Sequence, residues 1–88
     1  MGLLKFLNKR KLRKGIENAE WRVGTVEMGG LPEALADLGK AHAEAGDFPN
    51  ASKYFLKASG EARKFERTRS LAPRFKSIAQ DYKNRTPA

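Results

Sequence analysis

The sequence predicts an all-α protein of three to four helices, built as a single domain over residues 1–88. Apolar residues recur at steps of three and four along most of the chain, which is the spacing of one helix face. Glycine and proline fall between these periodic segments, where helices typically end and begin. No segment alternates between apolar and polar residues over a useful length, so no strand is expected.

The first predicted helix carries a stripe of apolar residues at helical spacing. The stripe consists of Leu12, Ile16, Ala19, Val23 and Val26. Met28-Gly29-Gly30 is expected to end this helix, because glycine is a poor helix former. Residues 1–11 form a basic N-terminus, which is either mobile and solvated or in contact with an anionic partner.

The second helix is predicted to start at Leu31-Pro32, because proline is tolerated in the first turn of a helix. Gly46 is expected to end it, since glycine commonly follows a helix C-terminus. The inner face of this helix is predicted to hold Leu35, Leu38, His42 and Ala45. Asp47 can then cap a third helix that has Pro49 in its first turn.

Two further apolar stripes predict the third and fourth helices. The third helix presents Phe48, Ala51, Phe55, Ala58, Ala62 and Phe65. The C-terminal helix, over residues 70–84, presents Leu71, Phe75, Ile78 and Tyr82. Ser70 is a candidate cap for this last helix, and Pro73 fits its first turn. The alternative is one long helix with a kink near Pro73.

Residues 32–66 combine large and small apolar residues at fixed offsets on two helices. The residues of this motif are Leu35, Leu38, Gly39, His42, Gly46, Phe48, Ala51, Phe55 and Ala58. The pattern resembles the tetratricopeptide repeat (TPR), and the resemblance covers Pro32 to Phe65. It implies a TPR-like helix-turn-helix hairpin, packed by the flanking N- and C-terminal helices.

The spacing of the motif predicts how the hairpin packs. Gly39 and Ala51 are small where the two helices cross, and Phe55 fills the space beside them. Two positions depart from the TPR pattern. His42 replaces the usual aromatic residue, and Arg63 stands where the closing proline would be, so the third helix is expected to run longer than in a normal repeat. A single repeat cannot bury its own faces, so the flanking helices or a second copy of the chain must cover it.

TPR folds generally bind other proteins or peptides in a helical groove. The resemblance therefore implies a non-catalytic protein-protein interaction adaptor or assembly factor rather than an enzyme. His42 is the one histidine, and the nearby Asp37 and Glu44 do not share its helix face well. The chain has no cysteine. No catalytic residue, metal site, cofactor or small-molecule substrate is expected.

The net charge of +8 is concentrated at the two ends of the chain. Five basic residues near the N-terminus are candidates for an anionic partner: Lys9, Arg10, Lys11, Arg13 and Lys14. The alternative function is therefore a weak, salt-sensitive peripheral binder of an anionic membrane surface or of nucleic acid. The absence of a long apolar run and of a signal-peptide pattern predicts a cytoplasmic protein, peripheral at a membrane if the alternative holds.

Trp21 is the leading candidate for a contact with a protein partner. It lies about 180° from the apolar stripe of the first helix, at 100° per residue. Leu3, Leu7 and Met28 share this outer side. Exposed aromatic residues are enriched at the centres of protein interfaces. These four residues are expected to bind a protein partner, and a homodimer would bury them unless the C-terminal helix covers them within one chain.

Overall fold

The computed structural model describes the backbone of residues 2–85 and the side chains of residues 10–85. This part of the chain forms four α-helices and two short 3-10 helices, without a strand, which confirms the all-α prediction. In chain order the elements are α1 (Gly2–Thr25), η1 (Met28–Gly30), α2 (Leu31–Glu44), α3 (Phe48–Ala62), η2 (Arg69–Leu71) and α4 (Ala72–Arg85). No helix of the described residues is long and apolar enough to cross a membrane.

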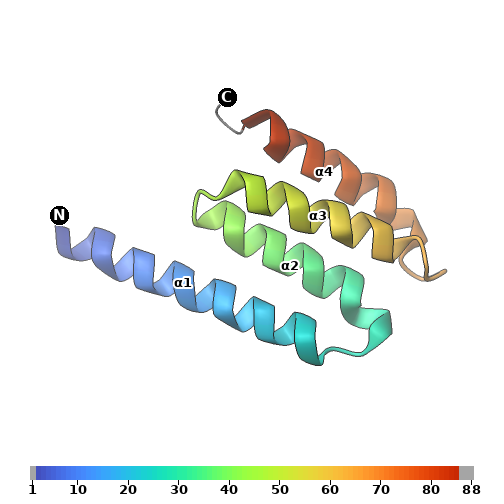
Figure 1. Cartoon of the computed structure of the whole chain (residues 1–88), viewed down its shortest axis with the longest axis horizontal. Coiled ribbons are helices and arrows are strands. Elements are labelled where there is room, and N and C mark those ends of the chain that lie inside the picture. Colours follow the sequence, from blue (N-terminus) through green and yellow to red (C-terminus); the bar gives the residue numbers. More distant parts are fainter. Residues whose placement is uncertain (1, 86–88) are drawn as a thin grey trace.

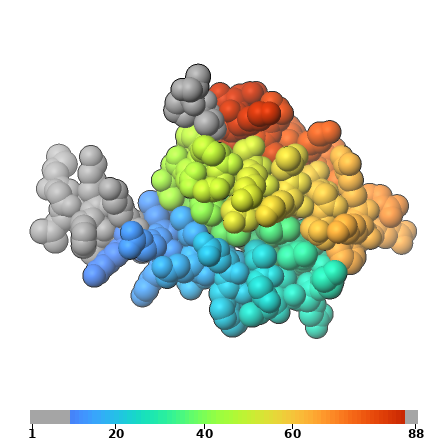
Figure 2. Space-filling model, in the orientation of Figure 1, coloured from blue at the N-terminus to red at the C-terminus, as the bar shows by residue number. Residues whose placement is uncertain are grey.

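The four α-helices lie side by side in one layer and run alternately in opposite directions (Figure 1). Each α-helix packs against the next one in the chain. The molecule measures 47 × 32 × 15 Å along its principal axes, so its thickness is close to that of one helix with its side chains. The helices α1 and α4 form opposite edges of this layer (Figure 2). Both broad faces of the layer are consequently open to solvent.

The α2–α3 turn follows the helix signals of the sequence. Pro32 lies in the first turn of α2. Gly46 has a φ of 81°, a conformation that glycine adopts without strain. Asp47 caps α3, because its Oδ1 accepts a hydrogen bond from the backbone nitrogen of Asn50 at 3.3 Å. The prediction that Ala45 belongs to the inner face of α2 is wrong, because this residue is the exposed C-cap.

The connection between α3 and α4 differs from the sequence prediction. The helix α3 ends at Ala62, so neither a longer third helix nor one continuous kinked helix forms. Thr68 stops it, since its buried hydroxyl donates a hydrogen bond to the backbone oxygen of Ala62 at 3.1 Å. The helix α4 begins at Ala72, and Ser70 lies within η2 instead of capping it. Pro73 falls in the first turn of α4, as predicted.

The core follows the α2–α3 and α3–α4 contacts and is built largely from small residues. Fully or almost fully buried alanines are Ala34, Ala51, Ala58, Ala62, Ala72 and Ala79. Phe55 fills the centre, and its ring lies 6.2 Å from that of Phe75 and 5.7 Å from that of Tyr82, centroid to centroid. The close approach of the helices follows from this composition, because alanine and glycine leave room for the neighbouring backbone.

Two serines of α3 fix its position against α4. Ser52 donates its hydroxyl to the backbone oxygen of Ala79 at 2.7 Å, and Ser59 donates to that of Ala72 at 2.8 Å. Ser59 is 3% exposed, so its hydroxyl is satisfied inside the core. These bonds couple the two helices at both ends of their contact and define the register in which α4 lies on α3.

The helix α1 packs on α2 through the predicted stripe. Ala19 is buried, whereas Leu12, Ile16, Val23 and Val26 are half-buried. An ion pair between exposed groups, Arg22 Nη1 and Asp37 Oδ2 at 3.2 Å, also joins the two helices. At the end of the layer, Arg67 Nη2 lies 3.3 Å from the backbone oxygen of Gly29 and 3.4 Å from Glu33 Oε1. The α3–α4 connection therefore contacts the α1–α2 connection.

Candidate functional site

A groove of about 430 Å³ runs over α3 between α2 and α4. Its lining residues are Ala36, Asp37 and Lys40 of α2, Phe55 of α3, and Leu71, Arg74, Phe75, Ile78, Asp81 and Tyr82 from η2 and α4. The groove follows from the layered arrangement, because α2 and α4 pack on α3 from opposite sides and line the groove together with Phe55. The groove is the candidate functional site.

The groove combines an apolar floor with a rim of both charges. Phe55 and Phe75 are buried at its base, and Ile78 is half-buried beside them. Asp37 and Asp81 contribute carboxylates, and Lys40 and Arg74 contribute positive charges. Such a surface offers apolar contacts together with charges of both signs.

A second hollow of about 250 Å³ continues this face toward α1. It is lined by Gly15, Asn18, Ala19, Arg22, Asp37, Lys40, Ala41 and Glu44. Asp37 and Lys40 belong to both depressions. The groove and the α1–α2 hollow are therefore adjacent parts of one face of the layer.

Most residues of the TPR-like motif hold the hairpin together rather than line the groove. The buried motif residues are Leu35, Leu38, Gly39, His42, Ala51, Phe55 and Ala58. Phe48 is half-buried and stacks on Tyr82 with 5.7 Å between ring centroids. The predicted helix crossing is confirmed, since a Cβ atom at Gly39 would lie 3.1 Å from the backbone oxygen of Ala51.

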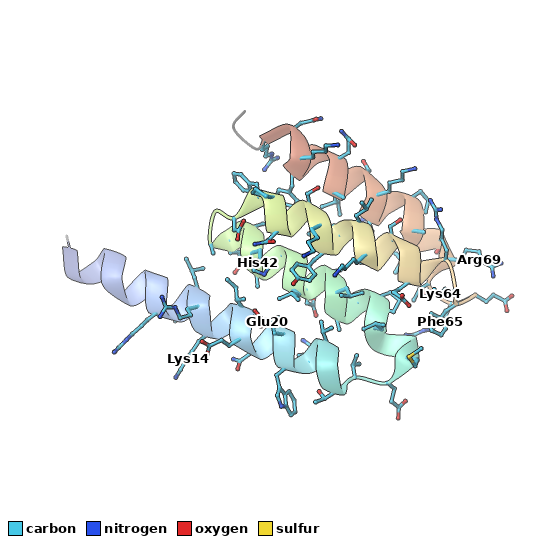
Figure 3. All side chains as sticks on the ribbon, in the orientation of Figure 1. Lys14, Glu20, His42, Lys64, Phe65 and Arg69 are labelled. Carbon is cyan, nitrogen blue, oxygen red and sulfur yellow. The ribbon has the colours of Figure 1, made fainter. Side chains whose placement is uncertain are left out.

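His42 lies between α2 and α3 and is 9% exposed (Figure 3). Its ring stacks on Tyr54, with 5.3 Å between centroids and 8° between the planes. Its Nδ1 is 3.6 Å from Asp47 Oδ2 and makes no hydrogen bond. The burial and the stacking fit the packing position that the motif predicts. Asp47 is the N-cap of α3, so a comparison of acids along the helix of His42, such as Asp37 and Glu44, does not identify it as a neighbour.

The candidates for partner contact on α1 lie apart from the groove. Trp21 is 69% exposed, as the prediction for the outer side of this helix requires. Met28 is 68% exposed, but it lies in η1 and not on the outer side of α1 as predicted, because α1 ends at Thr25. The side chains of Leu3, Leu7 and Lys9 lie outside the described residues. The other basic candidates, Arg10, Lys11, Arg13 and Lys14, are exposed along α1. Figure 3 shows Lys14 on the side of α1 away from the other helices.

The groove residues of α4 were absent from the sequence-based site. Leu71, Arg74, Ile78 and Asp81 recur at steps of three and four, which is the signal that could have indicated a shared side of one helix. Their assignment to a groove requires the position of α4 beside α3, which the sequence does not reveal. Among the described residues, no group of three His, Cys, Asp or Glu side chains is placed to hold a metal ion.

Comparison with known protein families, with curated proteins and with solved structures found no match to this chain.

Proposed function

We propose that this chain is a non-catalytic protein-interaction module, an adaptor or assembly factor, that binds an amphipathic helical segment of a protein partner in the groove between α2 and α4. The groove is the observation that carries this proposal, because it presents the half-buried Leu71 and Ile78 to a ligand between α2 and α4. An amphipathic helix in a groove uses apolar side chains at steps of three and four as anchors.

The length of the groove fits a short amphipathic helix. The groove extends from Leu71, at the end of η2, to Tyr82 of α4. At about 1.5 Å per residue this corresponds to roughly 16 Å, or about three helical turns. Lys40 and Arg74 can pair with acids on the ligand, whereas Asp37 and Asp81 already pair with Arg22 at 3.2 Å and Arg85 at 3.0 Å. The charges would select the orientation of the ligand, while the apolar floor would supply most of the affinity.

A TPR-like origin of the hairpin is part of this proposal. In its support, Gly39 and Ala51 allow the two backbones to approach, Phe55 fills the centre, and α4 packs on α3 as a third helix. A non-catalytic role is supported by the place of His42, which stacks on Tyr54 away from the residues that line the groove.

The test is the selection of a ligand followed by measurement of its binding site. Peptides from a random displayed library that bind the wild-type chain are synthesised, and their affinities are measured by fluorescence anisotropy at low and high salt. We expect helical ligands with apolar residues at steps of three and four, whose binding tolerates salt because the floor is apolar.

Two matched variants locate the site of these ligands. Ile78→Asn, in the groove, should weaken binding by about tenfold or more, as loss of an interface anchor does. Leu56→Asn, the same type of change at an exposed aliphatic residue outside the groove, should leave it unaltered. Circular dichroism confirms that both variants fold. Equal affinities for all three proteins would contradict the proposal.

A further inference from the structure

A third depression, distinct from the groove and from the α1–α2 hollow, lies on α3 and α4. The charged residues that line it are all lysines. Its volume is about 760 Å³, and it is lined by Pro49, Ser52, Lys53, Leu56, Lys57 and Lys83. Leu56 is 56% exposed and is one of the three large apolar side chains that are exposed among the described residues. The hollow therefore joins an exposed aliphatic side chain to three positive charges.

This lysine-rimmed hollow and the groove lie on opposite faces of the layer. On α4, Lys83 lines the hollow, whereas Asp81 and Arg74 line the groove. Residues two apart on a helix are rotated by about 200°, so Lys83 and Asp81 point to opposite sides. The hollow is thus independent of the surface to which the protein-interaction function is assigned.

The lysines of the hollow are available to a ligand. None of the ion pairs found among the described residues includes Lys53, Lys57 or Lys83. The Nζ atoms of Lys53 and Lys57 lie 5.7 and 5.3 Å from the ring centroid of Tyr54, within cation–π range. This contact keeps two ammonium groups on the same side of α3 without neutralising their charge.

The remaining lining favours an aliphatic ligand over a base or an acidic peptide. The side-chain carbons of Pro49 and Leu56 supply apolar surface, and the Ser52 hydroxyl is already donated to the backbone oxygen of Ala79 at 2.7 Å. No aromatic residue is among the described residues that line the hollow, and the Tyr54 ring that both Lys53 and Lys57 approach is stacked on His42, so it is not open for base stacking. Aliphatic insertion beside lysines is the mode of an interfacial membrane contact.

We propose that the lysine-rimmed hollow binds the surface of an anionic phospholipid bilayer. Leu56 enters the boundary between headgroups and acyl chains, while Lys53, Lys57 and Lys83 contact the phosphates and carboxylates of the headgroups. The apolar parts of the lysine side chains can lie along the boundary and keep their ammonium groups in the headgroup layer. The groove on the opposite face then remains open to a protein partner at the same time.

The first experiment measures binding of the full chain to vesicles. The probe is phosphatidylcholine with about a quarter phosphatidylserine, compared with phosphatidylcholine alone. Replacement of Lys53, Lys57 and Lys83 together by Gln should weaken binding by roughly fivefold per lysine and about 100-fold in all. The control changes three bases of the N-terminus in the same way, at Lys9, Arg10 and Lys11, and should weaken binding by less than about tenfold. A larger loss in the control than in the hollow variant would overturn the proposal.

The second experiment keeps the charge constant and locates the inserted residue. Leu56→Asn should weaken vesicle binding by about tenfold, because it removes the aliphatic insertion. The natural tryptophan is at position 21, so Leu56→Trp in a Trp21→Phe background gives a single reporter in the hollow. Its fluorescence should shift to shorter wavelength on anionic vesicles, while wild-type fluorescence should not.

Three results would refute membrane binding through the hollow. One is the absence of binding to anionic vesicles. Another is a shift of the wild-type fluorescence without a shift of the reporter in the hollow, which would place the membrane contact on α1. The third is binding to a single-stranded oligonucleotide or a polyglutamate peptide as tight as binding to the vesicles and insensitive to Leu56→Asn, which would indicate a general polyanion site.

Discussion

Gly39 on α2 faces the ring of Phe55 on α3 so closely that a Cβ atom at position 39 would lie 2.8 Å from Cδ2 of Phe55. The same atom would lie 3.1 Å from the backbone oxygen of Ala51. Phe55 cannot easily move away, because its other neighbours are the rings of Phe75 and Tyr82. The absence of a side chain at Gly39 therefore sets the distance between the two helices.

Replacement of Gly39 by leucine should destabilise the fold. Overpacking at this crossing is expected to lower the free energy of unfolding by about 1–3 kcal/mol or more, measured by urea denaturation. Gly60→Leu on α3 is the matched control, because nothing lies within 4 Å of a Cβ there. The Gly60→Leu variant should be about 0.5–1 kcal/mol more stable than the wild type, because leucine has a higher helix propensity than glycine. Equal stabilities of the two variants would contradict the close crossing.

Phe55→Ala should lower the free energy of unfolding by about 3–5 kcal/mol, because Phe55 is 5% exposed and central to the α3–α4 contact. The total stability of a chain of this size is on the order of 5–10 kcal/mol, so the variant is expected to keep only part of it and to unfold at a much lower temperature than the wild type. The adjacent Leu56→Ala should change it by less than about 0.5 kcal/mol. Thermal unfolding followed by circular dichroism compares the two variants, and a Phe55→Ala variant as stable as Leu56→Ala would contradict this packing.

His42→Phe should keep or raise the stability by about 1 kcal/mol. The buried Nδ1 makes no hydrogen bond, so an apolar ring removes a desolvation cost and still stacks on Tyr54. His42→Ala should instead be destabilising, because it removes the stacking surface. Calorimetry at neutral pH measures the stabilities of the two variants. A loss of more than about 1 kcal/mol in His42→Phe would mean that the 3.6 Å contact with Asp47 stabilises the fold.

Thr68→Val tests how α3 is terminated. It removes the buried hydroxyl that donates to the backbone oxygen of Ala62 while it conserves the shape of the side chain. The free energy of unfolding, measured by urea denaturation, is expected to fall by about 1–2 kcal/mol. Thr25 also donates its hydroxyl to a helix carbonyl, that of Trp21 at 2.9 Å, but at an exposed position. Thr25→Val should therefore change stability by less than about 0.5 kcal/mol, and a similar loss in both variants would contradict a special role for Thr68.

Self-association through the outer side of α1 is a further expectation. Trp21 is more than two-thirds exposed there, and Met28, in the adjacent η1, is equally exposed. The helix α4 lies at the opposite edge of the layer and does not cover α1 (Figure 1). We expect a dimer at tens of micromolar in sedimentation velocity, and a monomer for Trp21→Ala. Leu56→Ala, which removes a different exposed apolar side chain, should leave the dimer intact. A monomeric wild type at these concentrations would assign the exposed residues of α1 to another partner.

Local signals in the sequence predicted most of the fold. The cap at Asp47, the turn at Gly46 and the first-turn positions of Pro32 and Pro73 were all correct, because each depends on the backbone of a few neighbouring residues. The end of α3 was not predictable in this way. It depends on Thr68, which folds back six residues to reach Ala62.

The candidate sites were much less predictable, because they depend on the relative positions of helices. Periodicity identified large residues such as Ile78 and Tyr82 as the inner face of α4, yet these are half-buried and line the groove, while Ala72 and Ala79 are buried. Similarly, the sequence shows Leu56 only as one apolar residue of α3, whereas the structure places it in a hollow lined by three lysines. A pattern along one helix does not specify the neighbours of that helix.

The one-layer arrangement determines the order in which the helices detach and expose their backbone amides to solvent. The helix α3 is covered on both sides by α2 and α4, whereas α1 packs on α2 with Ala19 as the one buried side chain described in it. In such an array stability is approximately a sum of nearest-neighbour terms. Amide hydrogens of α1 should therefore exchange with solvent through detachment of this helix alone, and those of α3 through global unfolding. A partner that clamps α1 onto α2 would slow exchange in α1 without changing it in α3.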